Sequence, residues 1–246
     1  MREPGSGRLG PASPWRRVLA VAALPALAGV AVLAIWLWPT VVTTPRLARL
    51  FEYFESPAAH ADWQIKAGER CGDAPFLLPT DGYVGFGYGD SWRPGHRHTG
   101  FDIFAPTGLD ATPVLAAYPG YLTRMPEWVS TVIMRVPDDP LEPGRQIWVY
   151  YTHMADPNGV SYIDAAFPPG TFEVYIEAGT ILGRQGNYSG DPSNPTGIHL
   201  HISIVRDDGQ GAFLNETRME NTLDPSPYLG LEAGVYDDWS RPIVCR

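Results

Sequence analysis

The chain has 246 residues with 18 Lys+Arg and 27 Asp+Glu, and these charges are distributed unevenly along it. Residues 18–38 contain no charged side chain, and the 208 residues after them are enough for one domain, which excludes two large ones. Residues 1–17 hold four Arg and one Glu, a net charge of +3. Because the net charge of the whole chain is −9, residues 39–246 must carry −12. Such an acidic domain would repel phosphate, which argues against nucleic acid as a partner.

The uncharged run predicts a transmembrane anchor over residues 18–38. A helix of this length would span roughly 31 Å at ~1.5 Å per residue, close to the ~30 Å hydrocarbon core of a bilayer. Positive charge before the anchor predicts a cytoplasmic tail at residues 1–17 and an extracytoplasmic domain, as in a single-pass protein of the cell membrane. A cleaved signal peptide is the alternative. We favour the anchor because the apolar run is longer than the about 7–15 residues of the apolar region within a signal peptide.

Residues 39–70 are interpreted as a connector between the anchor and the domain. Leu47, Leu50, Phe51 and Phe54 recur at helical spacing, which predicts a short amphipathic helix. This helix has two interpretations that the sequence leaves equally open. It is either a stalk or membrane-surface helix, or a helix packed on the domain.

The only two cysteines are Cys71, where the domain begins, and Cys245, the penultimate residue. An extracytoplasmic domain lies in a compartment that permits disulfides. We therefore expect a disulfide that joins the two ends of the domain at residues 71–246. Two unrelated free thiols are the alternative.

The domain contains short runs rich in β-branched and aromatic residues, separated by Gly, Pro, Asn and Asp. These runs predict strands at residues 82–87, 113–117, 120–123, 129–136, 147–152, 172–176, 180–183 and 198–205. Many short strands with turn residues between them predict a mostly β, antiparallel architecture.

Histidine alternates with aliphatic residues in the last of these runs. In residues 199–205, His199, His201 and Ser203 share one parity, whereas Leu200, Ile202 and Ile204 share the other. On a strand, both imidazoles would project from the polar face while the aliphatic side chains face the core. Two imidazoles on one face of a strand can hold a metal, or a metal and a proton-transfer group.

A second cluster supplies a carboxylate. His98 and Asp102 flank Gly100 in a segment whose prolines and glycines disfavour a helix, so we expect an extended chain with both side chains on one side. The small Gly100 would leave the space between them open. Imidazoles with a carboxylate are typical zinc ligands, and three such ligands leave the fourth position for water. Alone, two alternating histidines on a strand are more often surface residues than a metal site, and a His four positions before an Asp occurs by chance in many chains.

Together these segments resemble the LytM/lysostaphin-type zinc endopeptidases of bacterial cell walls, over roughly residues 80–229. The resemblance lies in RHTGFDIFAPTG, TPVLAAYPGYLT, YYTHM, EAGTILGRQG, TGIHLHISI and DPSPYL. It implies a small antiparallel, sandwich-like β domain with its site in a groove, and peptidoglycan peptides as substrate. It also implies that one Zn²⁺ binds to His98, Asp102 and His201, while His153 and His199 assist catalysis.

The sequence departs from the family in its loops. Residues 137–146, 155–171 and 183–198 are longer than the family's usual connections and would border the groove. His96 is expected at the groove rim rather than among the ligands. If the loops occluded the groove, the chain would be a non-hydrolytic domain that binds wall peptides or activates a hydrolase, which is the alternative to an enzyme. A structural domain with incidental histidines is a remote third.

Overall fold

The computed structural model describes residues 14–91, 93–231 and 241–245, apart from the side chains of residues 14–26 and 39–44. The chain divides into two compact units, residues 1–38 and 39–246. Helix α1 (Pro14–Glu55) begins in the first unit and ends in the second.

The first unit consists of the early part of α1. Apart from the half-buried Leu37, its described large apolar side chains are exposed: Leu27, Val30, Val32, Leu33, Ile35, Trp36 and Trp38. Within the described part of the chain, no helix combines the length and the apolar character needed to cross a membrane. The predicted tail at residues 1–17 lies almost wholly outside the described residues, as do several side chains of the predicted anchor at residues 18–38.

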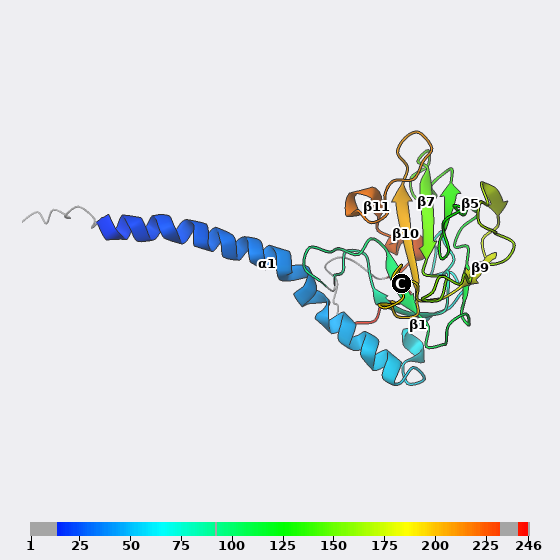
Figure 1. Ribbon diagram of the computed structural model, residues 1–246, viewed down its shortest axis with the longest axis horizontal. Helices are drawn as coiled ribbons and strands as arrows, with labels where there is room; N and C mark the ends of the chain where they lie inside the picture. Colours follow the sequence, from blue (N-terminus) through cyan, green and yellow to red (C-terminus); the bar gives the residue numbers. More distant parts are fainter. Residues whose placement is uncertain (1–13, 92, 232–240, 246) are drawn as a thin grey trace, which may run out of the picture. The chain divides into compact units, whose positions relative to one another are not determined.

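The second unit is built on antiparallel strands (Figure 1). The strands are β1 (Gln64–Ile65), β2 (Gly82–Phe86), β3 (Phe101–Phe104), β4 (Pro113–Leu115), β5 (Gly120–Thr123), β6 (Val132–Val136), β7 (Ile147–Thr152), β8 (Val174–Ile176), β9 (Ile181–Arg184), β10 (Leu200–Arg206) and β11 (Thr222–Leu223). The short helices are η1 (Ala61–Trp63), η2 (Met219–Asn221) and α2 (Ser226–Leu229). The mostly β, antiparallel prediction is confirmed, and each of the eight predicted runs overlaps a strand.

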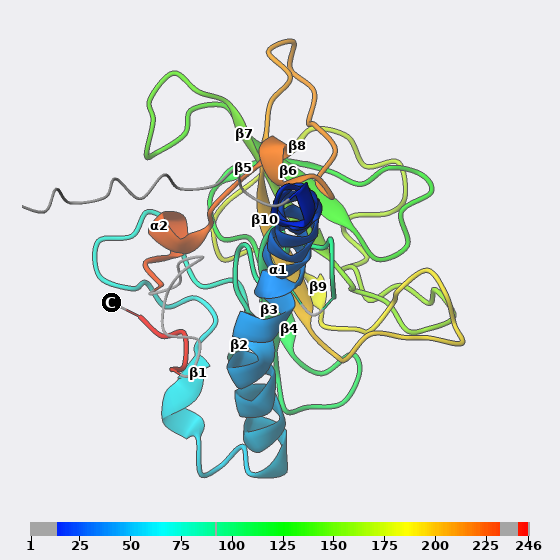
Figure 2. The same cartoon turned by 90° about the vertical axis from the view of Figure 1, so that its left-hand side faces the viewer.

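Nine strands form one sheet, and β4 pairs with β9 in a second, two-stranded sheet. In the large sheet the order is β1-β2-β3-β10-β7-β6-β5-β8, and β11 pairs with β10. Strands β1 and β8 therefore lie at opposite ends (Figure 2). Strand β10 is central, between β3 and β7, and its Leu200, Ile202 and Ile204 are fully buried in the main core. The predicted alternation of aliphatic residues thus places this strand over the core.

The end of α1 packs against strands β2 and β3 within the second unit. Leu50 and Tyr53 are buried in a cluster with Tyr83, Phe86 and Phe104. Of the two interpretations of the connector helix, the structure shows the packed helix.

Cys71 and Cys245 form a disulfide, with Cα atoms 5.1 Å apart. The predicted pairing is confirmed. The bond links the start of the domain to the end of the chain across 174 positions of sequence.

Candidate active site

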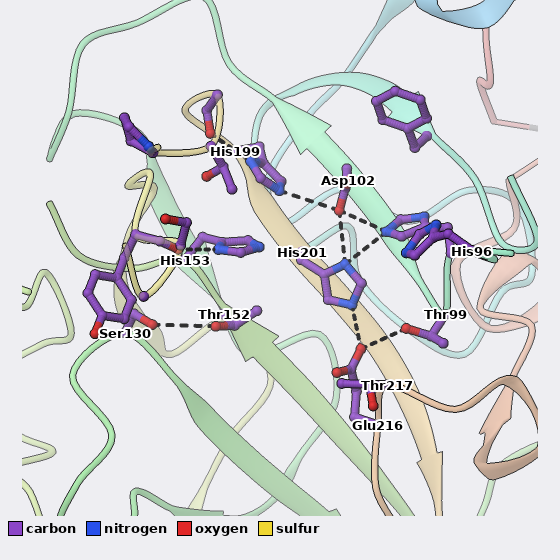
Figure 3. A pocket seen from close by; sticks show the side chains of 18 of the residues that line it. His96, Thr99, Asp102, Ser130, Thr152, His153, His199, His201, Glu216 and Thr217 are labelled. Atoms are coloured by element: carbon purple, nitrogen blue, oxygen red, sulfur yellow. Dashed lines mark hydrogen bonds and ion pairs between the residues drawn. The ribbon is translucent and has the colours of Figure 1, made fainter. Parts of the chain in front are cut away.

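Three donor atoms converge where β3 meets β10 (Figure 3). His98 Nε2 lies 3.0 Å from Asp102 Oδ1 and 2.9 Å from His201 Nδ1, and His201 Nδ1 lies 2.9 Å from Asp102 Oδ1. All three residues are buried. Within the described chain they form a group that could hold a metal ion. Four-coordinate zinc with bonds of ~2.0–2.2 Å places its ligand atoms about 3.3 Å apart, so this triangle fits zinc with little adjustment.

The other nitrogen of each ligand imidazole is held by an acceptor. His98 Nδ1 donates to the carbonyl oxygen of Gly87 at 3.0 Å, and His201 Nε2 donates to Glu216 Oε1 at 2.9 Å. A backbone carbonyl and an ionised carboxylate can only accept, so each ring, in the neutral form that binds a metal, keeps the lone pair on its other nitrogen, which lies in the triangle. Two such lone pairs and a carboxylate at one point are the donor set of a metal site.

Pairing between strands sets this geometry. His201 on β10 lies directly opposite Asp102 on β3. Gly100 is required for a different reason from the one predicted: a Cβ at this position would lie 2.1 Å from the carbonyl oxygen of Ile202. The glycine therefore lets the chain before β3 approach the backbone of β10, rather than clearing space between His98 and Asp102.

Two further imidazoles line the same cavity. His199 Nε2 lies 3.5 Å from Asp102 Oδ1, and the rings of His153 and His199 have centroids 4.4 Å apart. Their Nδ1 atoms donate to carbonyl oxygens of one loop, from His153 to Tyr188 at 2.6 Å and from His199 to Gly197 at 2.7 Å. Because the Nδ1 atoms make these bonds, the Nε2 atoms of both rings are the ones available to contact a substrate. The backbone of His153 has φ 74°, a strained conformation for a residue other than glycine.

The charges around the triangle are strongly coupled. Burial raises the pKa of Asp102, but the neighbouring His98 and His199 outweigh it and hold that pKa well below its usual value. Burial lowers the pKa of His201, but hydrogen bonds to Asp102 and Glu216 raise it to about 10. Burial, followed by repulsion from His199, lowers the pKa of His153 to about 3. His153 is therefore neutral near pH 7, and because its Nδ1 is the donor to Tyr188, its Nε2 carries no proton.

The site opens into a cavity of about 940 Å³. Its walls come from strands and from the inserted loop after β9, including Tyr188, Ser189, Gly190, Asn194, Pro195, Thr196 and Gly197. His96 lines the cavity without belonging to the metal-binding triangle, in agreement with its predicted place at the rim. Burial, with a contribution from His98, lowers the pKa of His96 to about 4.

Sequence reasoning missed Glu216. This residue lies between β10 and η2, 15 positions after His201, and no pattern around it marks it. Only folding brings its carboxylate to His201 and to Thr99, which donates to it from Oγ1 at 2.8 Å. Ser203 is the available clue, since this small residue on the histidine face of β10 leaves space beside His201.

Comparisons with known proteins give structural neighbours only. No protein-family model matches the chain, and no curated protein matches it. A variant of the catalytic domain of the prophage-encoded M23 protein EnpA from Enterococcus faecalis is 25% identical, with a TM-score of 0.37, and the match covers 61% of this chain and 96% of that one. The chain resembles M23-type peptidases.

Two other solved structures match less of their own length. Csd3 from Helicobacter pylori is 18% identical with a TM-score of 0.36, over 63% of this chain and 33% of that one. A protein named as a peptidase M23 from Pseudomonas aeruginosa is 21% identical with a TM-score of 0.37, over 73% of this chain and 62% of that one. The match thus spans about a third of the length of Csd3 and about three fifths of the length of the Pseudomonas aeruginosa protein.

Proposed function

We propose that the chain is a zinc-dependent endopeptidase that hydrolyses peptide bonds in the stem peptides or cross-bridges of peptidoglycan. The main support is the buried triangle of His98, Asp102 and His201, whose donor atoms lie 2.9–3.0 Å apart. Zn²⁺ bound there would polarise a water molecule and the scissile carbonyl. His153 and His199 face the same cavity and would hold or move the proton that passes to the leaving amine.

The cavity supports hydrolysis over the non-hydrolytic alternative. A binding or activating domain with an occluded site would have its inserted loops in the groove. Here the loop at residues 188–197 forms a wall of the cavity and leaves about 940 Å³ beside the imidazoles. That volume is in the range of sites that take small ligands or short peptide segments.

The test uses the full chain, purified in detergent and loaded with zinc. We expect one Zn²⁺ per chain and release of new amino termini from purified peptidoglycan, identified by mass spectrometry of the fragments. The control is the same protein after chelation, which should regain activity on addition of zinc. Protein that binds one zinc but releases no amino termini from any wall chemotype would contradict the enzyme proposal and favour the non-hydrolytic alternative.

We further propose that residues 18–38 anchor the chain in the cell membrane, with residues 1–17 in the cytoplasm and the catalytic domain outside. The support is the uncharged run and the positive charge before it. Reporter fusions at the two ends of the full chain should report opposite sides of the membrane. Release of the domain as a soluble, shortened chain would instead indicate a cleaved signal peptide.

A further inference from the structure

Glu216 contacts His201 on the side of the imidazole ring that faces away from Asp102 (Figure 3). Its Oε1 accepts hydrogen bonds from His201 Nε2 at 2.9 Å and from Thr99 Oγ1 at 2.8 Å. Ser203 Oγ lies 3.5 Å from the same oxygen. The side chain of Glu216 is only 14% exposed, so its carboxylate is held in place by these neighbours.

The two ligand imidazoles are supported differently. The second ring N–H of His98 donates a hydrogen bond to a backbone carbonyl, which is neutral, whereas that of His201 donates to a carboxylate. A carboxylate behind a ligand imidazole fixes the orientation of the ring and makes its metal-binding nitrogen a better electron donor. The two negative charges of Asp102 and Glu216 would also balance the two positive charges of a bound divalent cation.

The position of Glu216 follows from the fold around β10. Ser203 follows His201 by two residues and shares its face of the strand, where its small, fully buried side chain leaves space for the carboxylate. Thr99, adjacent to the ligand His98, fixes the other side of the carboxylate. Glu216 thus contacts His201 on β10 and also Thr99, in the segment before β3 that carries His98.

We propose that Glu216 is a positioning residue for the metal, one that orients His201 and raises the affinity of the site for a divalent cation. This proposal rests on one part of the proposed function, the binding of zinc by the triangle, and does not depend on peptide hydrolysis. Carboxylates in this position typically contribute 10–100-fold to metal affinity or activity. We therefore expect about a 10–100-fold increase in the zinc dissociation constant when the carboxylate is removed.

The experiment compares zinc dissociation constants of the full chain and its variants by competition with a chromophoric chelator. Glu216→Ala removes the acceptor, while Glu216→Gln keeps an acceptor oxygen without the charge. Glu220→Gln is the matched control, because Glu220 is exposed and pairs with Arg218 in the same segment. We expect the largest loss for Glu216→Ala, a smaller loss for Glu216→Gln and no change for the control.

A spectroscopic measurement separates positioning from folding. With Co²⁺ in place of zinc, the visible absorption bands report the ligand geometry, and we expect them to shift in Glu216→Gln while its far-UV circular dichroism stays that of the wild type. Wild-type zinc affinity and an unchanged cobalt spectrum in both Glu216 variants would overturn this proposal alone. Wild-type protein that binds no zinc would overturn it together with the proposed function.

Discussion

His199 lies immediately before β10 and His201 lies within it, two residues further on, yet the fold treats the two residues differently. His201 lies between two carboxylates, with its nitrogens 2.9 Å from Asp102 and 2.9 Å from Glu216. His199 stacks on Phe104 and donates to Gly197 of the loop, and its Nε2 is 3.5 Å from Asp102. The comparison shows that partners, and not spacing alone, separate a metal ligand from an imidazole that can move protons.

The same contrast divides the whole groove into two sides. The proposed metal side consists of Asp102 and His201, which strand pairing places opposite each other, and of His98, which lies before β3 and is held by the turn at residues 87–90. The proposed proton-transfer side consists of His153 and His199, which are held by carbonyl oxygens of the inserted loop. Loop-borne support suits groups that must adapt to a substrate, whereas metal ligands need fixed positions.

The sharpest way to break the comparison is to remove the imidazoles of His199 and His201 in turn. His201→Ala should lower zinc affinity by more than ~100-fold and abolish hydrolysis, because it removes a ligand and leaves two carboxylates without their shared partner. His199→Ala should keep its zinc while losing activity. Zinc per chain after dialysis distinguishes them, and equal zinc loss in both variants would show that the ligand assignment is wrong.

A second set of variants addresses the proton-transfer side alone. His153→Gln and His199→Gln should each reduce hydrolysis by about 10²–10⁴-fold, the usual contribution of a positioned acid or base, with zinc content unchanged. The measurement is the rate at which new amino termini appear from peptidoglycan. His60→Gln is the control, because His60 stacks on Trp63 outside the cavity lining. Full activity in either cavity variant would remove that residue from the mechanism.

The metal side depends on a buried ion pair that the sequence does not reveal. Arg46 of α1, 1% exposed, places its Nε 2.8 Å from Asp90 Oδ2. Asp90 in turn accepts from the backbone N–H of Gly87, and the backbone N–H of His98 donates to the carbonyl of Asp90 at 2.7 Å. The helix thus supports the turn against which His98 is fixed.

Arg46→Met should therefore lower the free energy of unfolding by about 3–5 kcal/mol, because it leaves Asp90 buried without its cation. Arg218→Met, which removes an exposed pair with Glu220, should change it by only about 0–1 kcal/mol. Urea unfolding of the full chain in detergent, followed by tryptophan fluorescence, measures both. Equal effects of the two changes would mean that the α1 contact contributes no more than a surface pair.

The sequence predicts the parts of this site that depend on local pattern. The alternating pattern of residues 199–204 predicts that Leu200, Ile202 and Ile204 of β10 face the core. The eight predicted runs overlap strands because β-branched residues and turn residues mark them. The identity of the ligand set came from the resemblance. Arg46 and Glu216 could not be found, because each acquires its partner only through tertiary contacts, 44 positions away for Asp90 and 15 for His201. Gly100 was singled out correctly, but its physical reason lies in the approach of two backbones.

That approach offers the mildest way to disturb the metal side without touching a ligand. In Gly100→Ala the new Cβ would lie 2.1 Å from the carbonyl oxygen of Ile202, so the chain before β3 must move away from β10. We expect a loss of about 1–3 kcal/mol in stability, as for other overpacked sites, with weaker zinc binding because His98 moves relative to His201. Gly108→Ala is the control, since a Cβ there meets nothing within 4 Å. Zinc affinity and urea unfolding measured on both variants should separate them, and a Gly100→Ala protein with wild-type values for both would contradict the role of this close approach in setting the ligand geometry.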